Sequence, residues 1–279
     1  MISVILPVRD GQPWLEAQLQ ALVGQQGVDD WELIVADNGS RDGSPAVAKW
    51  WADRHEHVRW FDAYTSPGAS GTRNAAAKAA RGDRLAFCDA DDLVQPDWLA
   101  ALAQALGDAE VAAGIFDFWA LSGRRNLPPV AAAMQQFGFL PAGLSANLAV
   151  RRDAFEEVGG FDEGLAVGED IDLCWRLQLA GFRFVVEPGA VVFKREPLAF
   201  REIFRQAFAY GRCGPVLYRR YRRSGARRDL AGAAKSWLWL LLHSPRLVKS
   251  GPERGEWARA AGMRTGRLAG SIGQGAFFP

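Results

Sequence analysis

The first 108 residues alternate short apolar runs with segments of helical periodicity, and this alternation is the feature that most limits the fold. The apolar runs, which are typical of buried strands, are 2–8, 31–36, 58–61 and 84–88. Prolines open three of the helical segments, two between these runs and one after the last, and Thr72 is expected to cap an alanine-rich helix that ends near Ala80. Strands that alternate with helices predict βαβ units, and therefore an α/β fold with a mostly parallel sheet flanked by helices.

Carboxylates follow two of these expected strands at the point where each strand ends. Asp37 comes directly after 31–36, and Asp89 comes directly after 84–88. In parallel sheets of this kind, ligands bind beyond the carboxyl ends of the strands. We therefore expect Asp37 and Asp89 to face one crevice, and a nucleotide is the ligand that such a crevice favours.

Three carboxylates stand within four residues in the turn after the fourth strand, at Asp89, Asp91 and Asp92. Taken alone, an Asp-Ala-Asp triplet is more often a solvated acidic loop than a metal site. Its position directly after an apolar run favours a ligand, because crowded like charges repel one another unless a cation relieves them. Mg²⁺ or Mn²⁺ suits the turn, since such ions are commonly held by one or two carboxylates together with substrate phosphates.

Seven segments of the chain form an ordered set of motifs, namely 3–9, 32–40, 71–75, 87–92, 147–152, 159–163 and 168–173. This set resembles the family 2 glycosyltransferases, an inverting family with the GT-A fold whose enzymes use nucleotide-sugar donors. Each segment alone is a weak match, but the ordered set is specific.

This resemblance implies a GT-A catalytic domain at 1–197, divided into a nucleotide-sugar-binding half at 1–108 and an acceptor-binding half at 109–197. A helical basic region follows at 198–279. The implied reaction moves a sugar, with inversion, from a nucleotide-diphosphate sugar to a hydroxyl of a carbohydrate or lipid-linked acceptor. Polysaccharide or glycolipid assembly is the implied setting.

On the donor side, the resemblance assigns Asp37 to the nucleotide base, although an aspartate before Gly39 also fits an Asx-turn. Arg73 is expected against the nucleotide, with an exposed arginine in the first turn of a helix as the equal alternative. Asp91 is expected to bind the metal most directly, and Asp89 to contact the metal or the donor. Further donor contacts are implied for Pro7, Val8, Arg9 and Ala90.

On the acceptor side, Glu169 and Asp170 resemble the acidic pair of the family. Inversion requires a general base that takes the proton of the acceptor hydroxyl, and Asp170 is preferred to Glu169 for this role. The alternative is helix capping, because acids stabilise helix N-termini. Asp172 lies on another face of that helix and is expected to cap it or to pair with Arg176. An acceptor contact is implied for Asn147.

One position departs from the family pattern. The family commonly has a histidine that helps to hold the metal shortly after the strand that follows the acidic helix, whereas this chain has Lys194 there. An ammonium group has only donors, so it is no metal ligand. We hypothesise that Lys194 neutralises the leaving diphosphate directly, and that aspartates, phosphates and water hold the metal.

Charge divides the chain into an acidic and a basic part. Residues 1–193 contain 15 Lys+Arg and 27 Asp+Glu, whereas residues 194–279 contain 18 and 5. Arginines beside Trp and Leu in the basic part fit a segment that lies on an anionic membrane surface. A helical hairpin packed on the catalytic domain, with solvated arginines, fits equally. The acidic main domain argues against a nucleic-acid partner.

The expected location is cytoplasmic, with a peripheral position on the inner face of the cytoplasmic membrane as the alternative. Three scattered cysteines favour reduced thiols, and neither a secretory signal nor an apolar run of about 20 residues is visible. Two other functions stay open. A sugar-phosphate nucleotidyltransferase would have a Gly-rich loop with Arg directly after the first strand, and a non-catalytic sugar- or lipid-binding module would need neither the acidic pair nor the metal turn.

Overall fold

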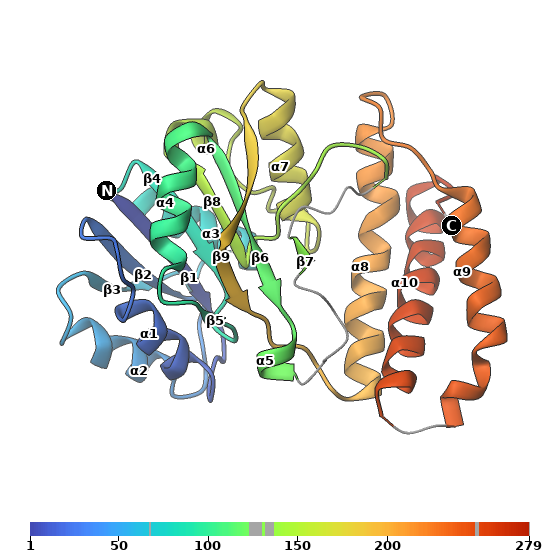
Figure 1. Cartoon of the computed structure of the whole chain (residues 1–279), viewed down its shortest axis with the longest axis horizontal. Coiled ribbons are helices and arrows are strands. Elements are labelled where there is room, and N and C mark those ends of the chain that lie inside the picture. The colour runs from blue at the N-terminus through green and yellow to red at the C-terminus, as the bar shows by residue number, and fades with distance from the viewer. Residues whose placement is uncertain (67, 123–129, 132–136, 249–250, 279) are drawn as a thin grey trace. The chain divides into compact units, whose positions relative to one another are not determined.

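The computed structural model describes residues 1–66, 68–122, 130–131, 137–248 and 251–278. They form two compact units (Figure 1). The first unit contains the described parts of 1–134 and 141–195, and the second contains those of 135–140 and 196–279. The segment 123–138, which the sequence suggests is irregular, lies mostly outside the described residues.

The first unit is built on a single sheet. Its described strands are β1 (Ile2–Val8), β2 (Trp31–Asp37), β3 (Val58–Asp62), β4 (Arg84–Cys88), β5 (Leu93–Val94), β6 (Val111–Asp117), β7 (Val130–Ala131), β8 (Asn147–Arg151) and β9 (Phe184–Phe193). They follow the order β3-β2-β1-β4-β8-β6-β9-β5, with β7 paired to β6. From β3 to β4 all pairs are parallel, whereas β5, β7 and β8 run antiparallel to their neighbours. The expected α/β fold is confirmed, with a parallel half and a mixed half.

Helices connect these strands and cover the sheet (Figure 1). They are α1 (Leu15–Val23), α2 (Ser44–Ala52), α3 (Gly68–Ala79), α4 (Trp98–Asp108), α5 (Trp119–Ser122), α6 (Arg152–Glu157) and α7 (Glu169–Leu179). Helix α4 shows why they pack, because it buries Trp98, Leu102 and Leu106 on one face. Strands β1, β2 and β4 are almost wholly buried and end at one edge, so the residues that follow them gather there.

The sequence predicts two further strands, at 182–186 and 191–193, on either side of a turn at Pro188-Gly189. Strand β9 differs from this prediction. It is continuous, and both of its halves pair in parallel with β6. The pairing moves from Ala113↔Val186 to Ile115↔Val191, so residues 187–190 bulge opposite Gly114. A side chain at Gly114 has no space, since its Cβ would lie 2.1 Å from the Ala190 carbonyl oxygen. The proline and glycine therefore form a bulge within one strand.

Helix α3 begins at Gly68, four residues earlier than expected from Thr72. Thr72 lies inside the helix, where its hydroxyl donates to the Gly68 carbonyl at 2.7 Å, so the expectation that Thr72 caps the helix is wrong. The amide of Asn38, in the turn after β2, donates to the carbonyls of Ser66 and Gly68 at 3.1 Å each. A contact distant in sequence thus fixes the start of α3.

The second unit is helical. It contains α8 (Phe200–Tyr221), α9 (Leu230–Leu242), the 3-10 helix η1 (Ser244–Val248) and α10 (Pro252–Gln274). Helix α10 lies between α8 and α9 (Figure 1). Within the described parts of the chain, no helix combines the length and the apolar character that a membrane span requires.

Glycines allow α8 and α10 to pack backbone against backbone. Gly262, Gly266 and Gly270 follow one another at four-residue intervals on α10 and face α8. A Cβ at Gly266 would lie 2.2 Å from the Phe208 carbonyl oxygen, which belongs to a helix backbone and cannot move aside easily. Gly273 of the same helix has no atom within 4 Å of the corresponding position.

We expect Gly266→Ala to lower the free energy of unfolding by about 1–3 kcal/mol, because the added methyl group forces the two helices apart. Gly273→Ala is the matched control, and it should be neutral or stabilising by roughly 0.5–1 kcal/mol because alanine favours the helix. Urea unfolding followed by circular dichroism measures both. Equal stabilities of the two variants would contradict the close packing described for α8 and α10.

Candidate active site

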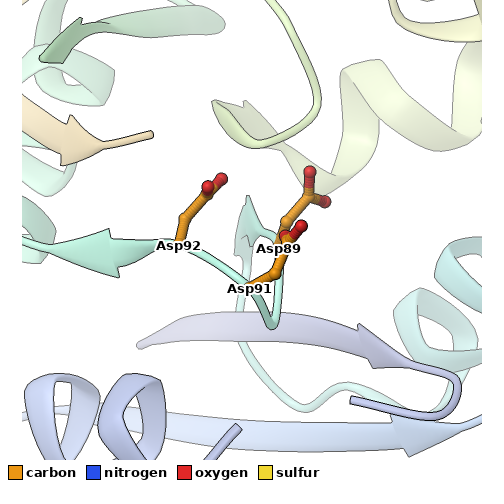
Figure 2. Close-up of side chains that lie close together, drawn as sticks. All are labelled: Asp89, Asp91 and Asp92. Carbon is orange, nitrogen blue, oxygen red and sulfur yellow. The ribbon is translucent and has the colours of Figure 1, made fainter. Parts of the chain in front are cut away.

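The carboxylate turn after β4 brings Asp89, Asp91 and Asp92 together. One carboxylate oxygen from each lies within 4.8 Å of those of the other two, and Figure 2 shows the three side chains extending to the same side of the turn. Asp92 is buried, Asp89 is partly exposed and Asp91 is exposed. Carboxylates crowded in this way form a donor set suited to a divalent cation.

Lys194, the residue directly after β9, contacts two of these aspartates. Its Nζ donates to Asp92 Oδ2 at 2.6 Å and to Asp89 Oδ2 at 3.2 Å. Burial opposes the charge on the ammonium group, but Asp89 and Asp92 outweigh it and raise the pKa of Lys194. Burial raises the pKa of Asp92 to about 7 despite this partner. Lys194 thus already supplies one positive charge among the three aspartates.

Arg195 holds the backbone of the same turn, a role that no motif in the sequence indicates. Its backbone N–H donates to Asp92 Oδ1 at 2.9 Å, and its Nε donates to the Asp91 carbonyl at 3.0 Å. The guanidinium group lies 3.7 Å from the ring centroid of Trp14. Lys194 and Arg195, the two residues that follow β9, thus both contact the turn. The geometry of the turn therefore depends on a segment about 100 residues further along the chain.

Arg73 connects the carboxylate turn to the acidic pair on α7. Its Nη2 donates to Asp89 Oδ1 at 2.9 Å, and its Nη1 donates to Glu169 Oε1 at 3.2 Å. The residue is 4% exposed, so the alternative of a solvated surface arginine is wrong. Burial raises the pKa of Asp89, but Lys194 and Arg73 outweigh it and hold that pKa below its ordinary value.

Glu169 and Asp170 begin α7, directly after Gly168, whose φ of +82° turns the chain into the helix. Asp170 accepts hydrogen bonds from the backbone N–H groups of Ile171 at 2.8 Å and Ser145 at 3.3 Å. Burial and the neighbouring Asp170 raise the pKa of Glu169 to about 7, and burial raises the pKa of Asp170. A carboxylate with a raised pKa accepts a proton more readily near neutral pH.

Asp172 faces away from this pair. It is fully buried and accepts from Arg176 Nε at 2.7 Å, so the expected pairing with Arg176 is confirmed. Arg176 in turn donates to the carbonyls of Val158 and Gly160 at 2.6 and 2.7 Å. This pair therefore fastens α7 to the loop that precedes it.

The expected base pocket lies at the ends of β1 and β2, where Val8 is paired with Asp37. Asp37 is 5% exposed, and its Oδ1 accepts from the Ser40 N–H at 3.4 Å, which agrees with the turn role. Pro7 is half-buried and Arg9 is exposed, whereas Val8 is buried. Strand β1 lies between β2 and β4, so these residues share one edge of the sheet with Asp89 and Ala90.

Asn147 requires a correction, because its side chain is fully buried in the sheet. Its Nδ2 donates to the carbonyls of Ile115 and Ala190 at 2.9 Å each, and its Oδ1 accepts from Trp98 Nε1 at 2.8 Å. Every polar atom of the amide is thus engaged inside the protein. Asn147 joins β8, β6 and β9, and the predicted acceptor contact is replaced by this structural role.

The sequence comparisons identify the family to which this fold and these carboxylates belong. The Glycosyl transferase family 2 sequence model matches residues 3–159, and the Glycosyl transferase family group 2 model matches residues 129–250. This chain belongs to glycosyl transferase family 2, as its motifs implied.

Among curated relatives, the Pre-mycofactocin glycosyltransferase of Mycobacterium tuberculosis is 28% identical over 251 residues, which cover 85% of this chain and 52% of that protein. The Succinoglycan biosynthesis protein ExoO of Rhizobium meliloti is 32% identical over 191 residues, covering 62% of this chain and 54% of that protein. The chain thus spans about half the length of these relatives.

Solved structures share the fold. Mannosyltransferase PcManGT from Pyrobaculum calidifontis, in complex with GDP-Man and Mn²⁺, superposes with a TM-score of 0.67 at 18% identity, over 98% of this chain and 86% of that chain. TarS 1–349 of S. aureus, in complex with UDP-GlcNAc, gives 0.58 at 18% identity, over 100% and 93%. The expected GT-A fold is confirmed.

Proposed function

We propose that this protein is an inverting glycosyltransferase that moves a sugar from a nucleoside-diphosphate sugar to an acceptor hydroxyl. The observation that carries the proposal is the joining of two carboxylate groups by one buried arginine. Arg73 contacts Asp89 of the turn after β4 and Glu169 at the start of α7. One group suits the diphosphate of a donor and its cation, and the other suits the hydroxyl of an acceptor.

Asp170 is the proposed general base. The acceptor oxygen forms a bond to the anomeric carbon on the face opposite the diphosphate, the bond from that carbon to the phosphate oxygen breaks, and the hydroxyl proton passes to the Asp170 carboxylate. Glu169 is held by Arg73, whereas the hydrogen bonds to Asp170 come from backbone N–H groups. Those bonds fix the direction of the carboxylate, and Asp170 forms no ion pair with a cationic side chain among the described residues.

A divalent cation is part of the proposal, and the carboxylate turn fits it. Asp91 is exposed and has no ion pair with any described residue, so it is open to a metal, and Asp89 would be the second ligand. When bound, Mg²⁺ or Mn²⁺ would neutralise the negative charge that develops on the leaving diphosphate. A structural neighbour was solved with Mn²⁺ and GDP-Man, which supports this class of ion and donor.

The donor is proposed to lie along the edge formed by β1, β2 and β4. Asp37 would accept from a ring N–H of the base, with Pro7, Val8 and Arg9 beside it and Ala90 under the ribose. Structural neighbours were solved with GDP-Man and with UDP-GlcNAc, and both bases present such an N–H. A thermal-shift screen of nucleotide sugars with Mg²⁺ or Mn²⁺ identifies the donor, and stabilisation by none of them would argue against the proposal.

The proposed setting is the assembly of a polysaccharide or glycolipid in the cytoplasm, at the inner face of the membrane. A relative is named for succinoglycan biosynthesis, which supports a carbohydrate or lipid-linked acceptor. The basic second unit is the part that would meet the lipid.

A nucleotidyltransferase is disfavoured because α7 supplies an acidic pair that such chemistry does not need.

Lys194 is proposed to share the neutralisation of the diphosphate. Replacing it by methionine should weaken donor binding about tenfold, because one buried positive charge is lost beside the phosphates. The same change should raise the affinity of the free protein for Mn²⁺ about tenfold or more, since Asp89 and Asp92 no longer share an ammonium group. Calorimetric titration with donor and with Mn²⁺ measures both effects.

Lys235→Met, a change at an exposed lysine of the second unit, is the matched control and should alter neither affinity. Loss of the Asp92 partner is also expected to lower stability, because removing one member of a buried ion pair is costly. Thermal unfolding therefore establishes the temperature at which the variant is folded. Unchanged donor affinity and turnover in folded Lys194→Met would show that Lys194 does not act on the diphosphate.

A further inference from the structure

The solvent-facing side of α9 is apolar, the reverse of what a helix on a protein surface normally presents. Exposed residues recur along it at the spacing of one helix face, namely Ala231, Ala234, Lys235, Leu238, Leu241 and Leu242. Leu238, Leu241 and Leu242 are 56%, 72% and 67% exposed. Lys235 is the single charged residue of the helix.

A further exposed apolar residue follows in η1, where Val248 is 90% exposed. We call Leu238, Leu241, Leu242 and Val248 the α9 ridge. The inner side of α9 is already occupied, since Ala233 and Leu240 are buried and Trp257 of α10 donates to the Leu240 carbonyl at 3.1 Å. The ridge is therefore not a core face left open by a missing helix of this unit.

The stretch of sequence that precedes and contains the ridge is strongly basic. Residues 219–248 contain eight Lys+Arg and one acid, Asp229. Asp229 caps α9 by accepting from the Gly232 N–H at 2.7 Å, so its charge serves the helix N-terminus. Residues 196–279 as a whole contain 16 Lys+Arg and five Asp+Glu. A second copy docked on the ridge would bring two positive units together, which opposes self-association.

We propose that the second unit binds an anionic lipid bilayer, with α9 lying in the membrane interface and the α9 ridge entering the boundary of the acyl chains. An apolar helix face in a segment of the chain that is rich in arginine and lysine is the pattern that binds in this way. Helix α9 has 13 residues, and a helix of that size is about 20 Å long, shorter than the ~30 Å hydrocarbon core. It therefore lies along the surface. The proposal does not depend on sugar transfer.

Co-sedimentation of the full chain with vesicles tests it at low salt. Binding is expected to phosphatidylcholine vesicles that contain phosphatidylglycerol, and not to pure phosphatidylcholine. Leu241→Glu should weaken partitioning at least about tenfold, because a leucine buried in the membrane is lost and a like charge faces the lipid. Position 241 is well exposed, so thermal unfolding of the variant should match that of the natural chain.

Ile272→Glu is the matched control, because Ile272 is 85% exposed on α10, in the same unit but outside the ridge. It makes the same change of charge and apolar area, and it should weaken partitioning less than about threefold. Absence of binding to the anionic vesicles, or equal losses in the two variants, would overturn the proposal. A dimer in sedimentation velocity that Leu241→Glu dissociates would also overturn it, in favour of a second copy on the ridge.

Discussion

Asp170→Asn should reduce kcat about 10²- to 10⁴-fold while the affinity for the donor stays nearly unchanged. An amide keeps the shape of the side chain but cannot take the proton of the acceptor hydroxyl, and general-base catalysis is typically worth that factor. The amide oxygen can still accept the 2.8 Å hydrogen bond from the Ile171 N–H, whereas the longer 3.3 Å bond from the Ser145 N–H goes to the other oxygen and is lost. The start of α7 should therefore persist. Initial rates and donor titration of the variant measure the two quantities.

Asp153→Asn is the matched control for this change. Asp153 also lies in the first turn of a helix, and its Oδ1 accepts from the next backbone N–H at 2.8 Å, as Asp170 Oδ1 does. Asp153 is exposed on α6, so its replacement should leave kcat unaltered. If kcat falls no further in Asp170→Asn than in Asp153→Asn, Asp170 is not the general base and only stabilises the start of its helix.

The pH dependence of kcat/KM in the natural chain should also show that a carboxylate acts as the base. The base acts only when deprotonated, so kcat/KM falls as the pH drops through the pKa of the acidic pair. Because burial raises the pKa values of both acids, and that of Glu169 to about 7, the loss should begin near neutral pH and not near pH 4. In Asp170→Asn the residual rate should lose most of this dependence.

Asp91→Asn should lower kcat/KM about 10²-fold, and it should weaken Mn²⁺ binding in the presence of nucleoside diphosphate at least about tenfold. Asp91 is the exposed member of the turn and forms no ion pair with the described residues, so its charge is available to a cation. Losing one carboxylate ligand removes charge from the site without disturbing the core. Calorimetry with Mn²⁺ and steady-state rates measure the two effects.

Asp97→Asn provides the comparison, since Asp97 is an exposed aspartate six residues further on, without a side-chain cap to α4. It should behave as the natural chain in both assays. If chelation of divalent ions leaves turnover intact, and Asp91→Asn is equally active, the carboxylate turn does not act through a metal.

The sequence predicted the parallel half of the sheet well because its strands are short, continuous apolar runs, such as 31–36, with turn residues after them. It failed at Pro188-Gly189, which normally signals a reversal of the chain. There the two flanking apolar runs pair with the same strand β6, and only that long-range pairing makes the segment a bulge. The expected chemistry of Asn147 failed for a related reason, because its burial depends on Trp98 and on carbonyls of two other strands.

At the site, the motifs identified the acidic residues and singled out Arg73 and Lys194, but they did not predict the ion pairs between these groups. Arg73 and Lys194 are 16 and 105 residues from Asp89, and no local pattern reveals that both contact it. The sequence did single out Lys194, because it stands where the family has a histidine. The structure sharpens that observation, since the ammonium group lies between Asp89 and Asp92 and adds positive charge to a turn that would otherwise hold three crowded carboxylates.

The central claim, that this site transfers a sugar with inversion from a nucleoside-diphosphate donor, is tested most directly by analysing the products by NMR. With the donor identified by the thermal-shift screen, Mn²⁺ and a panel of acceptor glycans, we expect release of nucleoside diphosphate together with a glycoside whose anomeric configuration is opposite to that of the donor. A product with retained configuration, or release of pyrophosphate or nucleoside monophosphate in place of the diphosphate, would contradict the account.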